Sequence, residues 1–392
     1  MWIPRTVEPL LLRRAATRPV VVLTGARQTG KTSLVRRLFP DYRFVTLDLP
    51  SEADQAERDP ATFLTRHPPP LIVDEVQYAP GLFRHLKMAV DAERERNGWF
   101  ILTGSQPLRL MAAGADALAG RADIVELEPL SYAEARAANP RLTPEDFLVR
   151  SGFPEAHADP RIETRGFLQS YVATYLERDL RQLLQVLRLR DHERFLRAVA
   201  LRSAQLLNRA DLARDVGIAG STAAAWLSVL EASHQSALLE PWFSNQTTSL
   251  AKRPKIHLRD AGLAAFLCGV HSARELAASP LAGPLWETLV CSELRRSQLN
   301  RTGSWNIHFY RDRTGEADFL VHRAGRFHLG EAKWTAFPRR RAVRSLRKVA
   351  RRLGDDTVES RTIFCRSPAS FPLGARTHAV ALGDIAALSA WI

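Results

Sequence analysis

A short glycine-rich motif near the amino terminus constrains this sequence more than any other feature. Residues 25–32 read Gly-Ala-Arg-Gln-Thr-Gly-Lys-Thr, which is a glycine, four residues and then Gly-Lys-Thr. The apolar run 19–23 (Pro-Val-Val-Val-Leu) precedes the motif and is typical of a buried parallel strand, and residues 31–38 have helical spacing. A strand, this turn and a helix in that order predict a phosphate-binding loop (P-loop) in an α/β domain.

The chemistry of this loop explains each residue type. Glycines let backbone N–H groups wrap a β-phosphate at a helix N-terminus, Lys31 places a charge beside the β and γ oxygens, and Thr32 supplies an oxygen ligand for magnesium. We therefore expect ATP and Mg²⁺ to bind through Gly25, Ala26, Arg27, Gln28, Thr29, Gly30, Lys31 and Thr32.

A second apolar run, Leu71-Ile72-Val73, stops at the acids Asp74 and Glu75. The carboxyl ends of parallel strands form the ligand-binding edge of such a sheet. We assign Asp74 to the magnesium ion and Glu75 to the water that attacks the γ-phosphate.

The third apolar run, residues 99–102, ends at Thr103-Gly104-Ser105-Gln106. Ser105, which we prefer, and Gln106 are candidates to reach the γ-phosphate or the attacking water. The transferred phosphoryl group also needs a cation. Arg121 is our first choice and Arg178 the second, and for each of them a solvated surface arginine is the alternative.

The pattern of apolar residues divides the chain into four segments. Residues 1–133 alternate strand and helix patterns and form the predicted ATPase core, with a doubly wound parallel sheet. Residues 134–190 are helical in pattern and are interpreted as a lid on that core. Residues 191–270 carry two short helices around Gly217 and two apolar strands, which suggest a winged helix-turn-helix. Residues 271–392 return to a smaller α/β pattern.

Composition adds a hypothesis about partners. The 392 residues carry a net charge of +13, which favours a polyanion such as DNA, although the abundance of arginine can also follow from biased codon usage. The sequence lacks the roughly 20 uninterrupted apolar residues of a membrane helix and the apolar core of a signal peptide. We therefore expect a cytoplasmic protein without a membrane partner, whose three cysteines are reduced thiols.

The C-terminal segment contains a possible second site. Asp318 and Glu331 lie on successive predicted strands with twelve residues between them, and Lys333 shares a strand face with Glu331. This resembles the PD-(D/E)xK nuclease pattern, in which two carboxylates hold magnesium and a lysine orients water. Glu287 on the preceding predicted helix is a candidate extra acid. An exposed hairpin with ordinary charges is the alternative.

A strongly basic helix follows this pattern. Arg340, Arg344 and Arg347 belong to a series of cations at helical spacing that runs from Arg339 to Arg352, while apolar residues keep to one side. Such a helix can pack inward and present cations to a DNA backbone. A solvated charged face is the alternative.

An ordered series of motifs resembles a prokaryotic family of AAA-type ATPases whose C-terminal half is the domain of unknown function numbered 4143. The resemblance implies a AAA-type core, ATP binding, and a winged-helix and nuclease-like C-terminal half. Ala317 departs from the pattern, where a branched aliphatic residue is more usual. The motifs are Ile3-Pro4-Arg5, residues 23–32, Asp74-Glu75-Val76-Gln77, residues 102–105, Gly120-Arg121, Gly152-Phe153-Pro154, residues 175–179 and residues 315–319.

Two functional hypotheses follow. The first is an ATP-driven, DNA-associated motor or remodeller that works as a homo-oligomer, with DNA cleavage as a variant. The second is a signalling switch in which ATP occupancy controls a protein partner. Salt-sensitive DNA binding distinguishes the first from the second.

Overall fold

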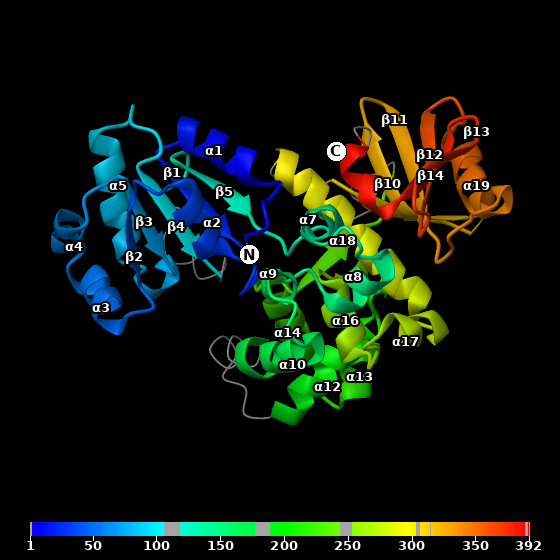
Figure 1. Cartoon of the computed structure of the whole chain (residues 1–392), viewed down its shortest axis with the longest axis horizontal. Helices are drawn as coiled ribbons and strands as arrows, with labels where there is room; N and C mark the ends of the chain where they lie inside the picture. Colours follow the sequence, from blue (N-terminus) through cyan, green and yellow to red (C-terminus); the bar gives the residue numbers. More distant parts are fainter. Residues whose placement is uncertain are drawn as a thin grey trace.

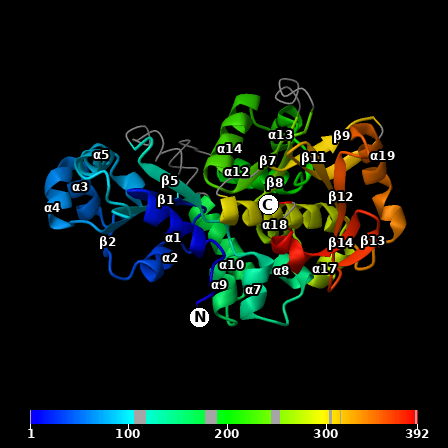
Figure 2. The ribbon, with the colours of Figure 1, turned by 90° about the horizontal axis from the view of Figure 1, so that it is seen from above.

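The computed structural model describes residues 2–105, 118–176, 189–243, 253–302, 306–313, 315–388 and 391. A parallel sheet and a mixed sheet lie at opposite ends of the molecule, and the helices of the central part lie between them (Figures 1 and 2). The long helix α18 (Ala282–Thr302) runs through this central part. Among the described residues, no helix combines the length and apolar character needed to cross a bilayer.

The N-terminal sheet has five parallel strands in the order β2-β3-β4-β1-β5. The prediction of an α/β unit with a parallel sheet is confirmed. One strand, β2, was not predicted from the sequence because only Val45 of its four residues is buried. The strands are β1 (Val20–Thr24), β2 (Arg43–Thr46), β3 (Leu71–Asp74), β4 (Phe100–Gly104) and β5 (Ala122–Glu126).

Helices cover both faces of this sheet. On one face, Leu11 and Leu34 pack with Val21 and Leu23 in a single cluster, and on the other face, helices including α5 pack around Val22. Burial on both faces explains why the strands are continuous apolar runs without alternation. The helices are α1 (Glu8–Thr17), α2 (Lys31–Leu38), α3 (Pro50–Arg58), α4 (Pro60–Arg66) and α5 (Leu82–Ala92).

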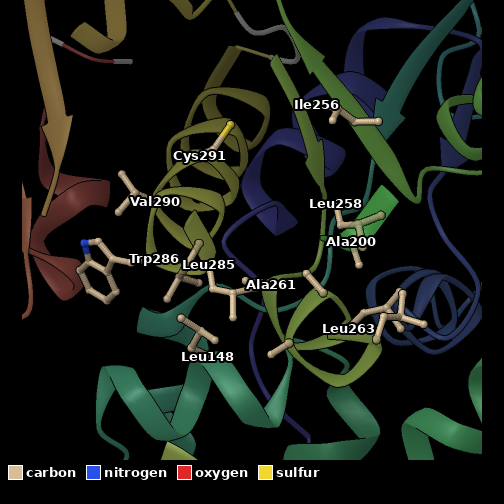
Figure 3. Packing of buried hydrophobic residues seen from close by; sticks show 14 of the residues in the cluster. Leu148, Ala200, Ile256, Leu258, Ala261, Leu263, Leu285, Trp286, Val290 and Cys291 are labelled. Carbon is tan, nitrogen blue, oxygen red and sulfur yellow. The ribbon is translucent and has the colours of Figure 1, made fainter. Parts of the chain in front are cut away.

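The segment interpreted as a lid is helical where it is described, but it packs mainly on the C-terminal half. Phe147, Leu148 and Phe153 share a hydrophobic cluster with Leu263 and Leu285. Figure 3 shows Leu148, Leu263 and Leu285 of this cluster. The apolar faces of these helices pack against α16 (Ala261–Leu267) and α18. Both faces of the parallel sheet are already covered by helices of the N-terminal part. The helices are α7 (Tyr132–Ala138), α8 (Pro144–Arg150), α9 (Pro154–Ala158) and α10 (Thr164–Tyr171), followed by a π-helical turn (Val172–Leu176).

Two helices and a small sheet follow in the central part. The left-handed Gly217 (φ 79°) ends α13 (Arg209–Val216) before α14 (Gly220–Ala232) begins. A three-stranded antiparallel sheet in the order β6-β8-β7 lies beside them. The remaining elements of this part are α12 (Leu189–Ala200), β6 (Gln205–Leu206), β7 (Ser236–Leu239), β8 (Lys255–Leu258) and α17 (Ala273–Ala278).

A six-stranded mixed sheet in the order β13-β14-β12-β11-β10-β9 forms the C-terminal part. One face packs on α18, where Trp286 lies in one cluster with Phe319 and Phe364, and the other packs on Leu346 and Val349 of α19. The elements are β9 (His308–Arg311), β10 (Glu316–Arg323), β11 (Arg326–Ala332), a 3₁₀ turn (Arg340–Val343), α19 (Arg344–Leu353), β12 (Val358–Cys365), β13 (Phe371–Gly374), β14 (Thr377–Ala381) and a 3₁₀ turn (Leu382–Ala387).

Candidate functional site

The P-loop connects the carboxyl end of β1 to the start of α2. Gly25 has φ 147°, and a Cβ atom on it would lie 2.2 Å from the carbonyl oxygen of Leu127, so only glycine fits. Gly30 is left-handed (φ 90°) and immediately precedes Lys31, the first residue of α2. The motif therefore places backbone N–H groups at a helix N-terminus, as a phosphate-binding loop requires.

Lys31 is almost fully buried and lies over this loop. Its Nζ donates to the carbonyl oxygens of Gly25 and Ala26, each at 2.9 Å. The Thr29 hydroxyl also donates to the Ala26 carbonyl oxygen, at 2.9 Å. The ammonium group therefore already lies at the loop that would hold the phosphates.

Three threonine hydroxyls converge on Asp74 at the end of β3. Thr32 Oγ1 donates to Asp74 Oδ1 at 2.8 Å, Thr46 Oγ1 lies 3.3 Å from Oδ2, and Thr103 Oγ1 also contacts Oδ1. A carboxylate beside a P-loop hydroxyl is the oxygen-rich pair that Mg²⁺ prefers, so the residues fit this ion. The sequence did not single out Thr46 and Thr103, although each is a threonine near the carboxyl end of a strand next to β3.

Glu75 follows Asp74 in a left-handed conformation (φ 54°), which is uncommon for a residue other than glycine. Its backbone N–H lies 3.3 Å from Thr103 Oγ1, and its Oε2 accepts from Gln77 Nε2 and lies 3.5 Å from Ser105 Oγ. Ser105 therefore lies beside the carboxylate that we assign to the attacking water, and its predicted contact with the γ-phosphate or the water stays a prediction. Gln77 was not predicted to contact Glu75.

The arginines proposed for charge stabilisation lie elsewhere. Arg121 pairs with Asp91 through two contacts of 2.7 and 2.9 Å, and its carbonyl oxygen accepts from Val20 at the amino end of β1. The P-loop is at the carboxyl end of β1, so Arg121 does not reach the phosphate site of its own chain. Arg178 and Gln106 lie outside the described residues.

A buried arginine that the sequence did not reveal as functional, Arg5, ties the P-loop to the segment after β5. Its Nη1 donates to the Thr29 carbonyl oxygen at 2.9 Å, its Nη2 donates to the Glu128 carbonyl oxygen at 2.7 Å, and its Nε lies 3.4 Å from Glu134 Oε2. Burial alone would raise the pKa of Glu134, but Arg5 and backbone N–H groups outweigh it and hold that pKa below its ordinary value. Glu134 also completes the capping box of α7 with Ser131.

An ionic cluster continues from the end of β5 into the C-terminal half. Arg295 on α18 contacts Glu126 at 2.9 Å and Glu128 at 3.0 Å, and Arg259 contacts both acids as well. His234 Nδ1 lies 3.0 Å from Glu126 Oε1. Burial opposes ionisation of Glu126, but the two arginines outweigh it and hold its pKa well below the ordinary value. These five residues form what we call the β5 ionic cluster.

Three acids of the C-terminal half lie around one lysine, Lys255. The sequence did not connect this lysine with them. Lys255 Nζ lies 2.9 Å from Glu287 Oε1, 2.8 Å from Glu316 Oε1 and 3.3 Å from Asp318 Oδ1. Asp318 Oδ2 accepts from the backbone N–H of Ala332 at 2.9 Å. Burial and the nearby Asp318 raise the pKa of Glu287 to about 8.

Glu331 faces a different cation, because its Oε1 lies 2.5 Å from Lys333 Nζ. Burial raises the pKa of Glu331 despite this contact. Within the described part of the chain, no group of three or more histidine, cysteine or acidic residues is arranged to hold a metal ion. The metal site that we expected on Asp318 and Glu331 therefore does not fit this arrangement, because the Lys255 ammonium lies among the acids.

The basic helix has the expected two faces. Arg340, Arg344 and Arg347 are exposed, whereas Leu346 and Val349 are buried against the mixed sheet. Arg344 and Arg347 are thus exposed on the outer side of α19, and Arg340 is exposed in the 3₁₀ turn that precedes it.

Comparisons with known proteins match three consecutive regions. A AAA domain matches residues 17–136, the domain of unknown function DUF8612 matches residues 142–274, and the domain of unknown function DUF4143 matches residues 282–385. Uncharacterized proteins of Mycobacterium tuberculosis and Mycobacterium bovis are each 31% identical over 342 residues, which cover 86% of this chain and 76% of theirs.

Two of the solved structures that resemble this chain are described by their sequence identity, TM-score and coverage. A Walker-type ATPase of Pyrococcus abyssi is 17% identical with a TM-score of 0.44, covering 68% of this chain and 96% of its own. The RuvB Holliday junction branch migration motor of Thermotoga maritima is 15% identical with a TM-score of 0.31, covering 59% of this chain and 88% of its own.

Proposed function

Because this chain belongs to a family of AAA-type P-loop ATPases with the DUF4143 domain at the C-terminus, we propose that it hydrolyses ATP with Mg²⁺ and uses the cycle to move or remodel DNA. The observation that carries the ATPase part is the group of side chains at the carboxyl edge of the parallel sheet. Lys31 lies over the P-loop, Thr32 contacts Asp74, and Glu75 is held beside them.

Each of these residues has a separate task. Lys31 would contact phosphate oxygens, and Thr32 and Asp74 would hold a magnesium ion, which would neutralise charge on the phosphates. Glu75, positioned by Ser105 and by Gln77, accepts a hydrogen bond from the attacking water and orients it.

Two substitutions test this assignment. Lys31→Ala removes the phosphate contact and should abolish ATP binding measured by calorimetry. Glu75→Gln keeps the shape and should bind ATP while its turnover falls roughly 100-fold or more, because general-base contributions have about that size. Arg84→Ala, on exposed surface of α5, is the control with unchanged turnover. Wild-type turnover in both test variants would refute the ATPase assignment.

DNA binding is supported by the charge and by its placement. The chain has a net charge of +13, and the exposed arginines of the Arg340 to Arg352 region gather on one helix face. The helices α13 and α14, joined at Gly217, with the β7–β8 pair beside them, support a winged helix-turn-helix as a second contact. We propose that the nuclease-like C-terminal domain clamps DNA through phosphates.

A charge-reversal comparison tests the DNA proposal. The triple variant at Arg340, Arg344 and Arg347 to glutamate should bind duplex DNA more weakly. Its DNA-binding constant should also depend less steeply on salt. The slope of the logarithm of this constant against the logarithm of the salt concentration should decrease in magnitude by about 0.9 for each phosphate that the variant no longer neutralises.

The matched control reverses Arg58, Arg94 and Arg96, which are exposed on the N-terminal module, and so changes the net charge equally. Equal weakening in both triple variants would refute a specific role for the basic helix. Absence of salt-sensitive binding in the wild type would favour the switch that acts on a protein partner.

A homo-oligomer could bring Arg121 of one chain to the phosphate site of another, which Arg121 does not reach within its own chain. We propose that Arg121, which lies at the opposite edge of its own sheet, acts on the γ-phosphate bound by a neighbouring copy. ATP turnover per chain should then rise with protein concentration, and mixing Lys31→Ala chains with Arg121→Ala chains should restore turnover. No restoration in mixtures that form mixed oligomers would refute the role of Arg121.

A further inference from the structure

Lys255 is the only residue of β8 whose side chain enters the acidic cluster of the C-terminal domain. It is 3% exposed, and its Nζ contacts acids from two other elements, Glu287 on α18 and both Glu316 and Asp318 on β10. The ring of Phe309 lies 5.5 Å from the same Nζ. A buried ammonium is costly unless it is paired, so this position is stable only because the acids surround it.

The geometry around Nζ is that of a cation site. Three carboxylate oxygens from three side chains converge on one atom at 2.8 to 3.3 Å. A divalent cation would bind the same oxygens at about 2.0 to 2.6 Å, and it cannot occupy this position while the ammonium does. The other lysine of the region, Lys333, cannot serve in this way because it contacts Glu331 and is partly exposed.

We propose that Lys255 is a built-in counter-ion that takes the position a divalent cation would need in this carboxylate cluster of the C-terminal domain. The cluster then needs no metal to be stable, and its acids hold no metal for hydrolysis of DNA. The ammonium also fastens β8 of the central part to α18 and β10, so the same contact joins two regions of the chain. This inference does not depend on ATP hydrolysis.

The acids are not arranged to hold a metal ion as they stand, but removing the ammonium should let them move together around a divalent cation. With Lys255 replaced by methionine, Glu287, Glu316 and Asp318 would face one another without a cation, and their mutual repulsion would be relieved by a divalent ion. Lys255→Arg keeps the positive charge and should remain free of metal. Lys333→Met removes a lysine from the same region and is the matched control.

The test is a titration of the nucleotide-free, full-length protein with Mn²⁺, followed by calorimetry and by the decrease of the free Mn²⁺ electron paramagnetic resonance signal. All variants carry Asp74→Asn, so that the P-loop site does not contribute. Lys255→Met should gain one bound Mn²⁺ per chain, and adding Asp318→Asn should remove it. Mn²⁺ should raise the Tm of Lys255→Met and leave that of Lys333→Met unchanged.

Two results would overturn the proposal. One is an Asp318-dependent Mn²⁺ site in protein that retains Lys255, since the ammonium would then not exclude the metal. The other is a folded Lys255→Met protein that gains no Mn²⁺. If Lys255→Met does not fold, the test compares protein that retains Lys255 with and without Asp318→Asn. The same number of bound Mn²⁺ ions per chain in both supports the proposal. A smaller number with Asp318→Asn refutes it.

Discussion

Replacing Arg5 with methionine should loosen the P-loop without altering any residue that contacts ATP in our proposal. The guanidinium donates to the Thr29 carbonyl oxygen inside the loop, donates to the Glu128 carbonyl oxygen beyond β5, and pairs with Glu134. Methionine replaces the aliphatic part of the arginine side chain, but it leaves Glu134 without its arginine and two buried carbonyl groups without this donor.

The expected magnitude follows from the burial of the pair. Both side chains are less than a tenth exposed, and removing one partner of such a buried pair costs about 3 to 5 kcal/mol. Arg14→Met is the control, because Arg14 pairs with Asp123 at the surface and a pair of that kind contributes only about 0 to 1 kcal/mol.

Hydrogen exchange of the α2 amides is the direct assay, because α2 begins at the P-loop. A local destabilisation of about 3 kcal/mol corresponds to roughly 150-fold faster exchange, and the ATP dissociation constant should rise together with it. Exchange and ATP affinity in Arg5→Met that match those of Arg14→Met would refute the idea that Arg5 holds the loop in place.

Two further outcomes follow from the geometry. Gly25→Ala should abolish ATP binding in calorimetry because its Cβ would collide with the Leu127 carbonyl oxygen, whereas Gly120→Ala, at another positive φ with open space around it, should bind ATP normally. Burial lowers the pKa of His192 to about 4, so the unfolded state binds a proton below about pH 6.5 that the folded state does not. The resulting decrease in stability, about 2 kcal/mol at pH 5 relative to neutral pH, should be smaller in His192→Leu when unfolding is followed against pH, and equal pH dependence would contradict this account.

Local patterns in the sequence were sufficient to predict which residues gather at the carboxyl edge of the parallel sheet, and their roles toward ATP stay a prediction. The P-loop, Asp74 and Glu75 could be assigned because each follows a buried apolar strand, and parallel strands bring their carboxyl ends together. The AAA-type core and the DUF4143 region are also confirmed by the comparisons. The first of these conclusions depends on residues that are close in sequence, and the second depends on an ordered set of motifs.

Contacts between distant residues could not be predicted in the same way. Arg5 and Glu134 are 129 positions apart, and Lys255 and Asp318 are 63 positions apart. Nothing in the local pattern of Lys255 distinguishes it from a lysine at the start of an ordinary hairpin strand, so its burial among acids depends on how β8 packs against α18. The pairing of the C-terminal acids with Lys255 was missed for this reason.

The β5 ionic cluster has a consequence for how relatives of this protein can exchange parts. Its acids belong to the AAA domain, and Arg259 and Arg295 belong to the two regions that follow. A chimera that joined the AAA domain of one relative to the C-terminal half of another would retain the buried charges of one side without their partners, unless both sides were inherited together. Recombination at the sequence boundaries between these domains would therefore be selected against, and the acids and arginines should change in concert between lineages.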